Sequence, residues 1–339
     1  MAGVGNPETE AVMIVVTGAA GMIGSGVVWA LNRRGEERIL AVDSLGTDDR
    51  WRNLRGLHFA DYQEKDAFLE RILQGQTPAG IRAIIHLGAC SDTTERDAGY
   101  LVRNNFEYTK HLAAFAVERG IRFIYASSAA TYGDGSRGYA DREESLPDLE
   151  PLNMYGYSKH LFDLWAWRAG LLQTITGLKY FNVFGPNEYH KGEMRSVVLK
   201  AYEQIRATGA IRLFRSHRPE FADGEQKRDF IYLKDAVAMT LFCLDHPGVT
   251  GILNVGSGAA RTWNDLARAI FAALDRPPRI EYIDMPEELR ERYQYFTQAE
   301  LARLRQAGWN ESGTPLEAAV REYVINYLVP GAYLSATSA

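Results

Sequence analysis

Tyr155 and Lys159 form a pair whose residue types and spacing could carry out proton transfer. They lie four residues apart in a stretch with helical spacing, so both side chains share one helix face. A neighbouring ammonium group favours the phenolate and lowers the pKa of a tyrosine, and such a tyrosine can take the proton of an alcohol. Tyr157 is also near the lysine, but its spacing places it on a different face. Because such pairs also arise by chance, the context must decide whether this one is a site.

The context is a glycine-rich loop near the start of the chain and a serine after a predicted strand. Gly18, Gly21 and Gly24 stand between an apolar run and a stretch with helical spacing. There they permit a tight turn, close approach of a pyrophosphate and tight helix packing, which predicts a dinucleotide site. Ser128 follows the predicted strand 122–126, and ligands bind at the carboxyl ends of such strands. Together these features predict hydride transfer between an alcohol and a nicotinamide.

The residues after the second predicted strand bear on which dinucleotide is bound. Asp43 ends that strand, where a carboxylate bonds the adenine-ribose hydroxyls of NAD and repels the 2′-phosphate of NADP. Cations that could bind a 2′-phosphate follow it in the sequence: Arg50, Arg52, Arg55 and Lys65. These residues alone leave both NAD and NADP open.

Strand and helix candidates alternate through the first half of the chain. This alternation predicts right-handed crossovers and a parallel sheet. The predicted fold class is α/β, a Rossmann-type doubly wound parallel sheet with a smaller α/β C-terminal substrate domain. The expected division is a dinucleotide-binding domain at 12–180 with return segments around 229–256, a substrate domain at 181–228 and 257–328, and flexible tails at 1–11 and 331–339.

Composition argues against several classes of function. The 339 residues carry a formal net charge of −5, so the overall charge favours neither nucleic acid nor an anionic membrane. No run approaches the ~18 apolar residues that a membrane span needs. Cys90 and Cys243 fit neither a disulfide framework nor a zinc motif, and the histidines show no ligand spacing. We therefore predict a cytoplasmic protein without a metal site.

Further motifs extend the pattern along nearly the whole chain. The glycine loop, the strand-end serine and the Tyr-x-x-x-Lys pair resemble the extended short-chain dehydrogenase/reductase family. Members of that family act on nucleotide sugars with an NAD(P)-binding Rossmann domain. A series of segments between residue 13 and about residue 328 resembles its branch that inverts C6 of an ADP-linked heptose for the lipopolysaccharide core: 86–91, 127–133, 179–186, 190–192, 227–230 and 292–298.

The resemblance implies NADP as cofactor, ADP-heptose as substrate and a homo-oligomer such as a pentamer. It implies that Tyr155 and Lys191 are the two acid/base residues and that Ser128 assists them. The residues expected to line the cofactor are Gly18, Gly21, Met22, Ile23, Gly24, Asp43, Ser44, Arg50, Lys65, Leu87, Gly88, Ala89, Cys90, Ser91, Asn104, Lys159 and Val183. Those expected to line the substrate are Ser128, Asn182, His190, Glu193, Lys200, Phe214, Arg215, Ser216, His217, Arg228 and Tyr293.

Two acid/base residues suit inversion at an exocyclic carbon. After oxidation the carbonyl group can rotate about the bond that joins it to the ring. The carbonyl oxygen therefore occupies two positions, and each position needs its own proton donor. Spacing alone favours an exposed loop lysine at Lys191, and only the resemblance favours catalysis there. Several residues depart from the pattern of that branch and put the fine substrate contacts in doubt: Glu193, Lys200, Arg215 and His217.

Two other functions compete with this interpretation. A UDP-hexose 4-epimerase would share the fold and the chemistry. A 4,6-dehydratase is disfavoured because Ala129 and Ala130 stand where elimination of water needs an acid pair. The alternative from a different class is a non-catalytic dinucleotide sensor, since fold alone does not establish function. Retention of Ser128, Tyr155 and Lys159 disfavours it.

Overall fold

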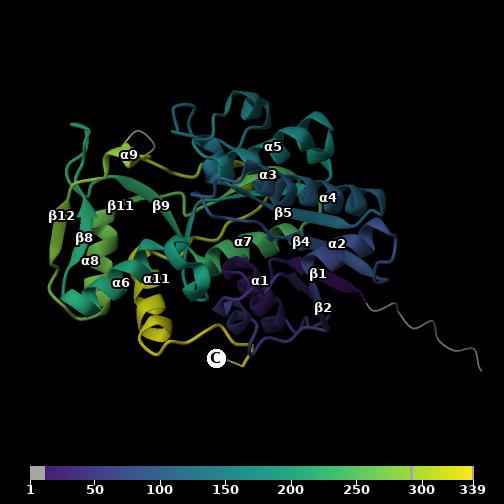
Figure 1. Cartoon of the computed structure of the whole chain (residues 1–339), viewed down its shortest axis with the longest axis horizontal. Coiled ribbons are helices and arrows are strands. Elements are labelled where there is room, and N and C mark those ends of the chain that lie inside the picture. The colour runs from purple at the N-terminus through teal and green to yellow at the C-terminus, as the bar shows by residue number, and fades with distance from the viewer. Residues whose placement is uncertain (1–11, 291–292, 338–339) are drawn as a thin grey trace, which may run out of the picture.

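A seven-stranded parallel sheet forms the centre of the computed structural model, which describes residues 12–290 and 293–337 (Figure 1). The strand order is β3-β2-β1-β4-β5-β6-β10, which confirms the predicted doubly wound α/β fold. The order reverses beside β1, and ligands bind at the carboxyl ends of strands at such a point. The strands are β1 (Met13–Thr17), β2 (Ile39–Asp43), β3 (Asp61–Glu64), β4 (Ile81–His86), β5 (Arg122–Ser128), β6 (Thr176–Tyr180) and β10 (Gly251–Val255).

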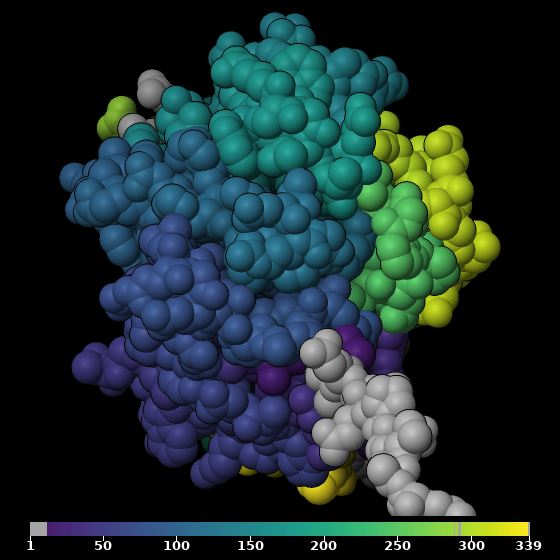
Figure 2. Space-filling view, turned by 90° about the vertical axis from the view of Figure 1, so that its right-hand side faces the viewer, coloured from purple at the N-terminus to yellow at the C-terminus, as the bar shows by residue number. Residues whose placement is uncertain are grey.

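Helices cover both faces of this sheet. Ile14 and Val16 point into the core on one face and Val15 into the core on the other, which explains why the strand is apolar without alternation. One face carries α1 (Met22–Arg33) and α7 (Leu233–Asp245). The other carries α2 (Lys65–Leu73), α4 (Tyr108–Glu118) and α5 (Met154–Arg168). The face in Figure 2 is built mostly from the first half of the chain, coloured purple to teal.

The smaller part lies at one end of the sheet, on the left in Figure 1, and has its own apolar core. It contains a three-stranded sheet of β7 (Asn182–Phe184), β9 (Lys227–Tyr232) and β11 (Ala260–Thr262), and a parallel pair of β8 (Ile211–Phe214) and β12 (Ile280–Ile283). Its main helices are α6 (Val197–Thr208), α8 (Trp263–Ala273) and α11 (Leu316–Tyr323). The remaining short α-helices are α3 (Ala98–Leu101), α9 (Glu287–Arg290) and α10 (Ala302–Gln306).

The return of the chain to the large sheet differs in detail from the expectation. Within 229–256, α7 packs against α1 and β10 joins the large sheet, but β9 pairs with β7 and β11 in the smaller part. The expected tail 331–339 also differs, because Leu334 is 1% exposed and its N–H donates to Asn187 Oδ1 at 3.0 Å. The expected tail 1–11, and residues 338–339, lie outside the described residues.

Two findings concern membrane-crossing helices and metal-binding groups. None of the helices in residues 12–290 and 293–337 combines the length and the apolar character that a membrane crossing requires. Over the same residues, no three His, Cys, Asp or Glu side chains gather in a group that could hold a metal ion.

Candidate active site

A cleft of about 890 Å³ opens at the carboxyl ends of the parallel strands, between the large sheet and the smaller part. It is lined by every residue expected to line the cofactor, and by Tyr155, Lys159, Ser128 and Lys191. Segments that lie far apart in the sequence therefore meet at one site. Of the other residues expected to touch substrate, Asn182 and His190 also line the cleft.

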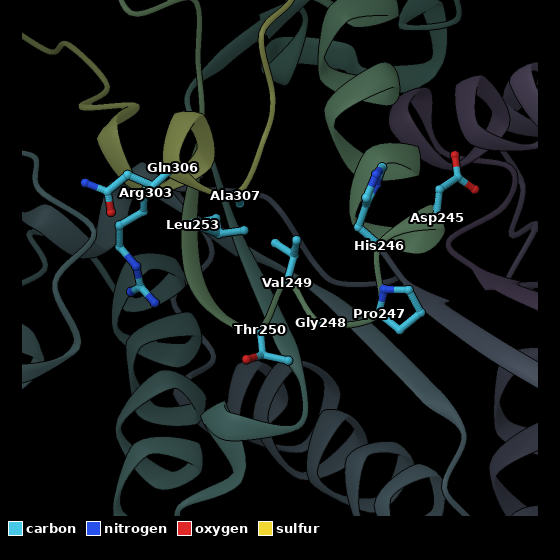
Figure 3. A pocket seen from close by; sticks show the side chains of 10 residues that line it. All are labelled: Asp245, His246, Pro247, Gly248, Val249, Thr250, Leu253, Arg303, Gln306 and Ala307. Carbon is cyan, nitrogen blue, oxygen red and sulfur yellow. The ribbon is translucent and has the colours of Figure 1, made fainter.

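A second hollow of about 580 Å³ lies elsewhere in the molecule (Figure 3). It is formed by the end of α7, the loop before β10 and helix α10, so it lies at the amino ends of the strands, away from the cleft. None of the predicted site residues lines it. Its lining is Asp245, His246, Pro247, Gly248, Val249, Thr250, Leu253, Arg303, Gln306 and Ala307.

The glycine loop connects β1 to α1, and a side chain at Gly18 or Gly24 would collide with neighbouring backbone atoms. Gly18 has φ +68°, and a Cβ there would lie 2.6 Å from Gly88 N. A Cβ on Gly24 would lie 1.9 Å from Gly18 O, so this glycine lets the helix approach the loop. Gly21 occupies the N-cap position of α1 without a side-chain cap, which leaves the first N–H groups of the helix free for an anion.

Asp43 and Arg50 form the wall beside this loop. Asp43 Oδ2 accepts from Ala20 N and its Oδ1 from Ser44 N, both at 2.7 Å, so the carboxylate also holds the glycine loop. Burial raises the pKa of Asp43, and these two N–H donors partly oppose that rise. Arg50 binds both carboxylate oxygens of Asp48 at 2.7–3.1 Å and lies 3.9 Å from Asp43.

Tyr155 and Lys159 lie one turn apart at the start of α5. Asn153 caps this helix, because its side chain accepts a hydrogen bond from Gly156 N at 2.8 Å. Lys159 Nζ donates to the carbonyl oxygen of Ala126 at 2.8 Å, which ties the lysine to β5 near the strand end that carries the predicted serine. By contrast, Tyr157 is 45% exposed and does not line the cleft.

The pKa of Tyr155 differs from the expectation. Burial raises it, and the Ser128 hydroxyl opposes that rise. Burial also lowers the pKa of Lys159 to about 8, against the opposing charge of Asp163. The predicted lowering of the Tyr155 pKa is therefore wrong here, because the loss of hydration on burial outweighs the hydrogen bond from Ser128.

Lys191 reaches the cleft from a 3₁₀ segment, Tyr189–Met194, that follows β7. Its backbone N–H donates to Glu188 O at 3.0 Å, and its ammonium group makes no hydrogen bond or ion pair with the described residues. Burial lowers the pKa of Lys191, and the carboxylate of Glu188 opposes that change. In the same segment, His190 faces Asn53 Nδ2 at 3.2 Å, and burial lowers its pKa to about 4.

Most residues expected to touch substrate lie in the smaller part, outside the cleft lining. Arg228 is buried, lies over the rings of Trp263 and Tyr293, and donates to Lys227 O rather than to the neighbouring Asp229. Trp263 lines the cleft and its Nε1 donates to the Tyr293 hydroxyl at 2.8 Å. Arg228 and Tyr293 therefore lie directly behind the cleft wall, and the ring of Phe214 packs against Tyr293.

The four residues that depart from the family pattern do not line the cleft. Lys200 Nζ donates to Glu193 O at 2.6 Å and to the Glu193 carboxylate at 3.1 Å, so these two residues bind each other. Arg215 lies within 4 Å of two carboxylates, Asp223 and Asp284. His217 N donates to the hydroxyl of Tyr295 at 3.1 Å, and Ser216 N donates to Asp223.

The structure adds residues that the sequence analysis missed. Asp48 was predictable from its place two residues before Arg50, and Arg195 and Ser196 from their place just after Lys191. Trp263 carries no sequence signal, because its helix comes to the cleft only in the folded chain. Missed lining residues include Thr17, Asp48, Thr93, Tyr100, Tyr108, Met194, Arg195, Ser196, Phe230, Trp263 and Leu266.

Comparison with known proteins identifies the family. The profile of the NAD dependent epimerase/dehydratase family matches residues 14–256. The chain belongs to this family. The ADP-L-glycero-D-manno-heptose-6-epimerase of Nitratidesulfovibrio vulgaris is 56% identical over 316 residues, which cover 93% of this chain and 98% of the relative.

Solved structures of other epimerases share the fold. The ADP-L-glycero-D-manno-heptose-6-epimerase of Helicobacter pylori matches with a TM-score of 0.77 at 24% identity, over 94% of this chain and 96% of that one. The UDP-glucose 4-epimerase of Thermus thermophilus, solved in complex with NAD, matches with a TM-score of 0.71 at 24% identity, over 92% and 97% of the chains.

Proposed function

We propose that this protein interconverts ADP-D-glycero-β-D-manno-heptose and ADP-L-glycero-β-D-manno-heptose by transient oxidation at C6. The similarity to the Nitratidesulfovibrio enzyme supports the substrate. The observation that carries the chemistry is that two acid/base candidates from different elements, Tyr155 on α5 and Lys191 in the segment after β7, line the same cleft as the glycine loop.

The residues of the glycine loop fit a nicotinamide dinucleotide. Gly18 and Gly24 leave a cradle that a Cβ would fill, and the free first turn of α1 suits a pyrophosphate. We propose NADP rather than NAD, because Arg50 and Lys65 line the cleft and supply positive charge for a 2′-phosphate. Bound between these residues, the dinucleotide would supply reversible hydride transfer at the alcohol carbon.

The protein's own groups handle the proton at each position of the oxygen. In one position the phenolate of Tyr155, stabilised by the Ser128 hydroxyl, takes the proton of the alcohol. Rotation about the exocyclic bond then carries the carbonyl oxygen to the second position, where Lys191 returns a proton. The partly buried amine of Lys191 suits this role, because burial lowers its pKa and makes its ammonium form a stronger proton donor than that of an exposed lysine. Lys159 holds the strand end and orients the nicotinamide ribose.

Two further expectations stay predictions of this proposal. The protein acts in the cytoplasm, and it forms a homo-oligomer such as a pentamer. Sedimentation of the purified protein at several concentrations measures the oligomeric state directly.

The test is NMR of the purified protein mixed with ADP-D-glycero-β-D-manno-heptose, first with no cofactor added. Conversion to a mixture of C6 epimers supports the substrate, the reaction and a retained cofactor together. No conversion, even with NADP and NAD supplied, contradicts the proposal and favours a UDP-hexose 4-epimerase, which a screen of UDP-hexoses detects. Failure of that screen leaves the dinucleotide sensor as the better explanation.

Two variants test the assignment of the acid/base groups. Tyr155→Phe and Lys191→Met are each expected to slow epimerisation by at least about 100-fold, the lower range for loss of a proton-transfer group, while the cofactor stays bound. Their matched controls are Tyr157→Phe, on the same helix but outside the cleft, and Lys110→Met, on the outer helix α4. Full turnover in either active-site variant contradicts the two-group mechanism.

A further inference from the structure

Glu188 is a buried carboxylate for which the mechanism above has no use. It is 0% exposed and immediately precedes the segment that carries Lys191. Its Oε2 accepts from Ser196 N at 2.5 Å, and its Oε1 accepts from Ser196 Oγ at 2.6 Å and from the Tyr323 hydroxyl at 2.9 Å. A buried carboxylate is costly unless its lone pairs are satisfied, and here three donors converge on it.

These contacts close the lysine-bearing segment into a loop. Glu188 stands at its start and Ser196 just beyond its end, so one side chain joins both ends of residues 188–196, hereafter the lysine loop. The backbone N–H of Lys191 donates to Glu188 O, within the first turn. Tyr323 is the last residue of α11 and fastens the carboxylate to the core of the smaller part.

The start of the lysine loop is also fastened to the dinucleotide-binding part. Asn187 has φ +70°, a conformation that asparagine tolerates better than most residues. Its side chain donates to Ser25 Oγ on α1 at 2.9 Å. Asn53 Nδ2 donates to Asn187 O at 2.9 Å and to Ala20 O in the glycine loop at 2.8 Å. The position of Glu188 is therefore fixed from both parts of the molecule.

Glu188 is also the negative charge that acts on Lys191. Burial lowers the pKa of Lys191 and Glu188 opposes that change. Burial raises the pKa of Glu188, and Lys191 heads the groups that oppose that rise. The other polar groups around the loop have partners other than the Lys191 amine: Tyr323 with Glu188, His190 with Asn53 and the charges of Arg50 and Asp48, Tyr189 with Tyr327 O and Ala332 O, Arg195 with Glu203, and Lys200 with Glu193.

We propose that Glu188 is a positioning residue for Lys191. Its carboxylate closes the lysine loop, so that the amine stands opposite Tyr155, and it keeps a negative charge beside the amine. This inference rests on the proposed function, because it assigns Glu188 a role through Lys191. Glu188 itself does not line the cleft and touches no reacting atom.

The decisive variant is Glu188→Gln, which removes the charge but preserves the shape. Its amide oxygen can still accept from Ser196 N, and its NH₂ can donate to the hydroxyls of Ser196 and Tyr323. We expect the pKa of Lys191 to fall by about 1, the lower range for loss of a nearby opposite charge. The NMR signals of ¹³C-methylated lysines report that pKa without any turnover, and Lys191→Met assigns the signal.

Single-turnover oxidation of each epimer, followed by the absorbance of reduced nicotinamide, provides the second measurement. The half-reaction that depends on Lys191 is the one that Lys191→Met abolishes. In Glu188→Gln the acid limb of that half-reaction is expected to move down by about 1 pH unit, while the half-reaction that depends on Tyr155 keeps its profile. Glu188→Asp retains the charge and is expected to restore the limb.

The matched control is Asp235→Asn in α7. Asp235 accepts from Thr314 N at 2.8 Å and from Thr314 Oγ1 at 2.9 Å, the same pattern as Glu188 with Ser196, and it does not line the cleft. We expect a similar loss of thermal stability in this control but no change in the pKa of Lys191. An unchanged Lys191 pKa in Glu188→Gln, or equal loss in both half-reactions, overturns the inference.

The outcomes also separate this inference from the proposed function. If Lys191→Met and Tyr155→Phe slow the same half-reaction, the two-group mechanism fails whatever Glu188 does. If Glu188→Gln does not fold, Tyr323→Phe replaces it. That variant removes only one donor from the carboxylate, so it favours the protonated acid and is expected to lower the pKa of Lys191 in the same direction by less. No change in Tyr323→Phe then overturns the inference.

Discussion

We expect Arg50 to decide whether the cleft distinguishes NADP from NAD. Its guanidinium binds both oxygens of Asp48 and lies near Asp43, and its side chain is 34% exposed. In Arg50→Gln this positive charge is removed, while the glycine loop and the N–H donors to Asp43 stay in place. We therefore expect a change confined to the ligand that carries a 2′-phosphate.

The magnitude follows from charge and exposure. A phosphate oxygen about 4 Å from a guanidinium gains about 4 kcal/mol per unit charge at an effective dielectric constant near 20. Loosening the Asp48 pair and screening at a partly exposed site offset about half of this. The net loss in Arg50→Gln is about 2 kcal/mol, so the Kd for NADP should rise about thirtyfold. Asp48→Asn removes the competing carboxylate and should change the Kd in the opposite direction.

Calorimetric titration of the cofactor-stripped protein with NADP and with NAD measures these effects. Affinity for NAD should change less than about threefold, since NAD has no 2′-phosphate. The matched control is Arg52→Gln, two residues away, whose side chain pairs with Asp49 and does not line the cleft. Equal weakening of NADP and NAD in Arg50→Gln would refute the assignment of this arginine to the 2′-phosphate.

Two further predictions concern the loop and the sheet. Gly24→Ala should destabilise the fold by about 2 kcal/mol and weaken dinucleotide binding, because the added Cβ would lie 1.9 Å from Gly18 O. Urea unfolding measures the stability and calorimetric titration measures the binding. The control Gly248→Ala, with open space around it, should change neither stability nor binding. Burial lowers the pKa of His86 to about 3, so unfolding takes up a proton below about pH 6.5 and acid removes stability. The stability advantage of the parent over His86→Gln should therefore shrink by about 1 kcal/mol between pH 6 and pH 5, and an advantage that stays constant would contradict a neutral buried histidine.

The sequence was most informative where one element carries a whole signal. The glycine spacing, Asp43 at the end of β2 and the Tyr155–Lys159 pair are all set by the geometry of a single strand or helix. The doubly wound sheet followed from the alternation of strands and helices. The polar strand β3 was not predicted, because Asp61–Glu64 has no apolar pattern and pairs only as the edge of the sheet.

The sequence was least informative where a residue acts through distant partners. In the sequence Glu188 is indistinguishable from an ordinary loop carboxylate, because only folding brings Ser196 and Tyr323 into contact with it. The direction of the Tyr155 pKa change depends on how completely the folded chain removes water, and no local spacing reports that. The residues after Pro330 were also predicted to form a flexible tail. The burial of Leu334 could not be foreseen, because its partners come from other parts of the chain.

That placement of Leu334 has a consequence for biosynthesis. The N–H of Ala336 donates to Gly56 O and the N–H of Leu334 donates to Asn187, so the last described residues brace the loops next to Arg50 and Lys191. In Figure 1 the yellow end of the chain runs back to the purple and blue loops of the first half. Domains begin to fold during synthesis from the N-terminal side. The glycine loop can therefore form early on the ribosome, whereas the cleft wall is braced only after residue 336 has emerged.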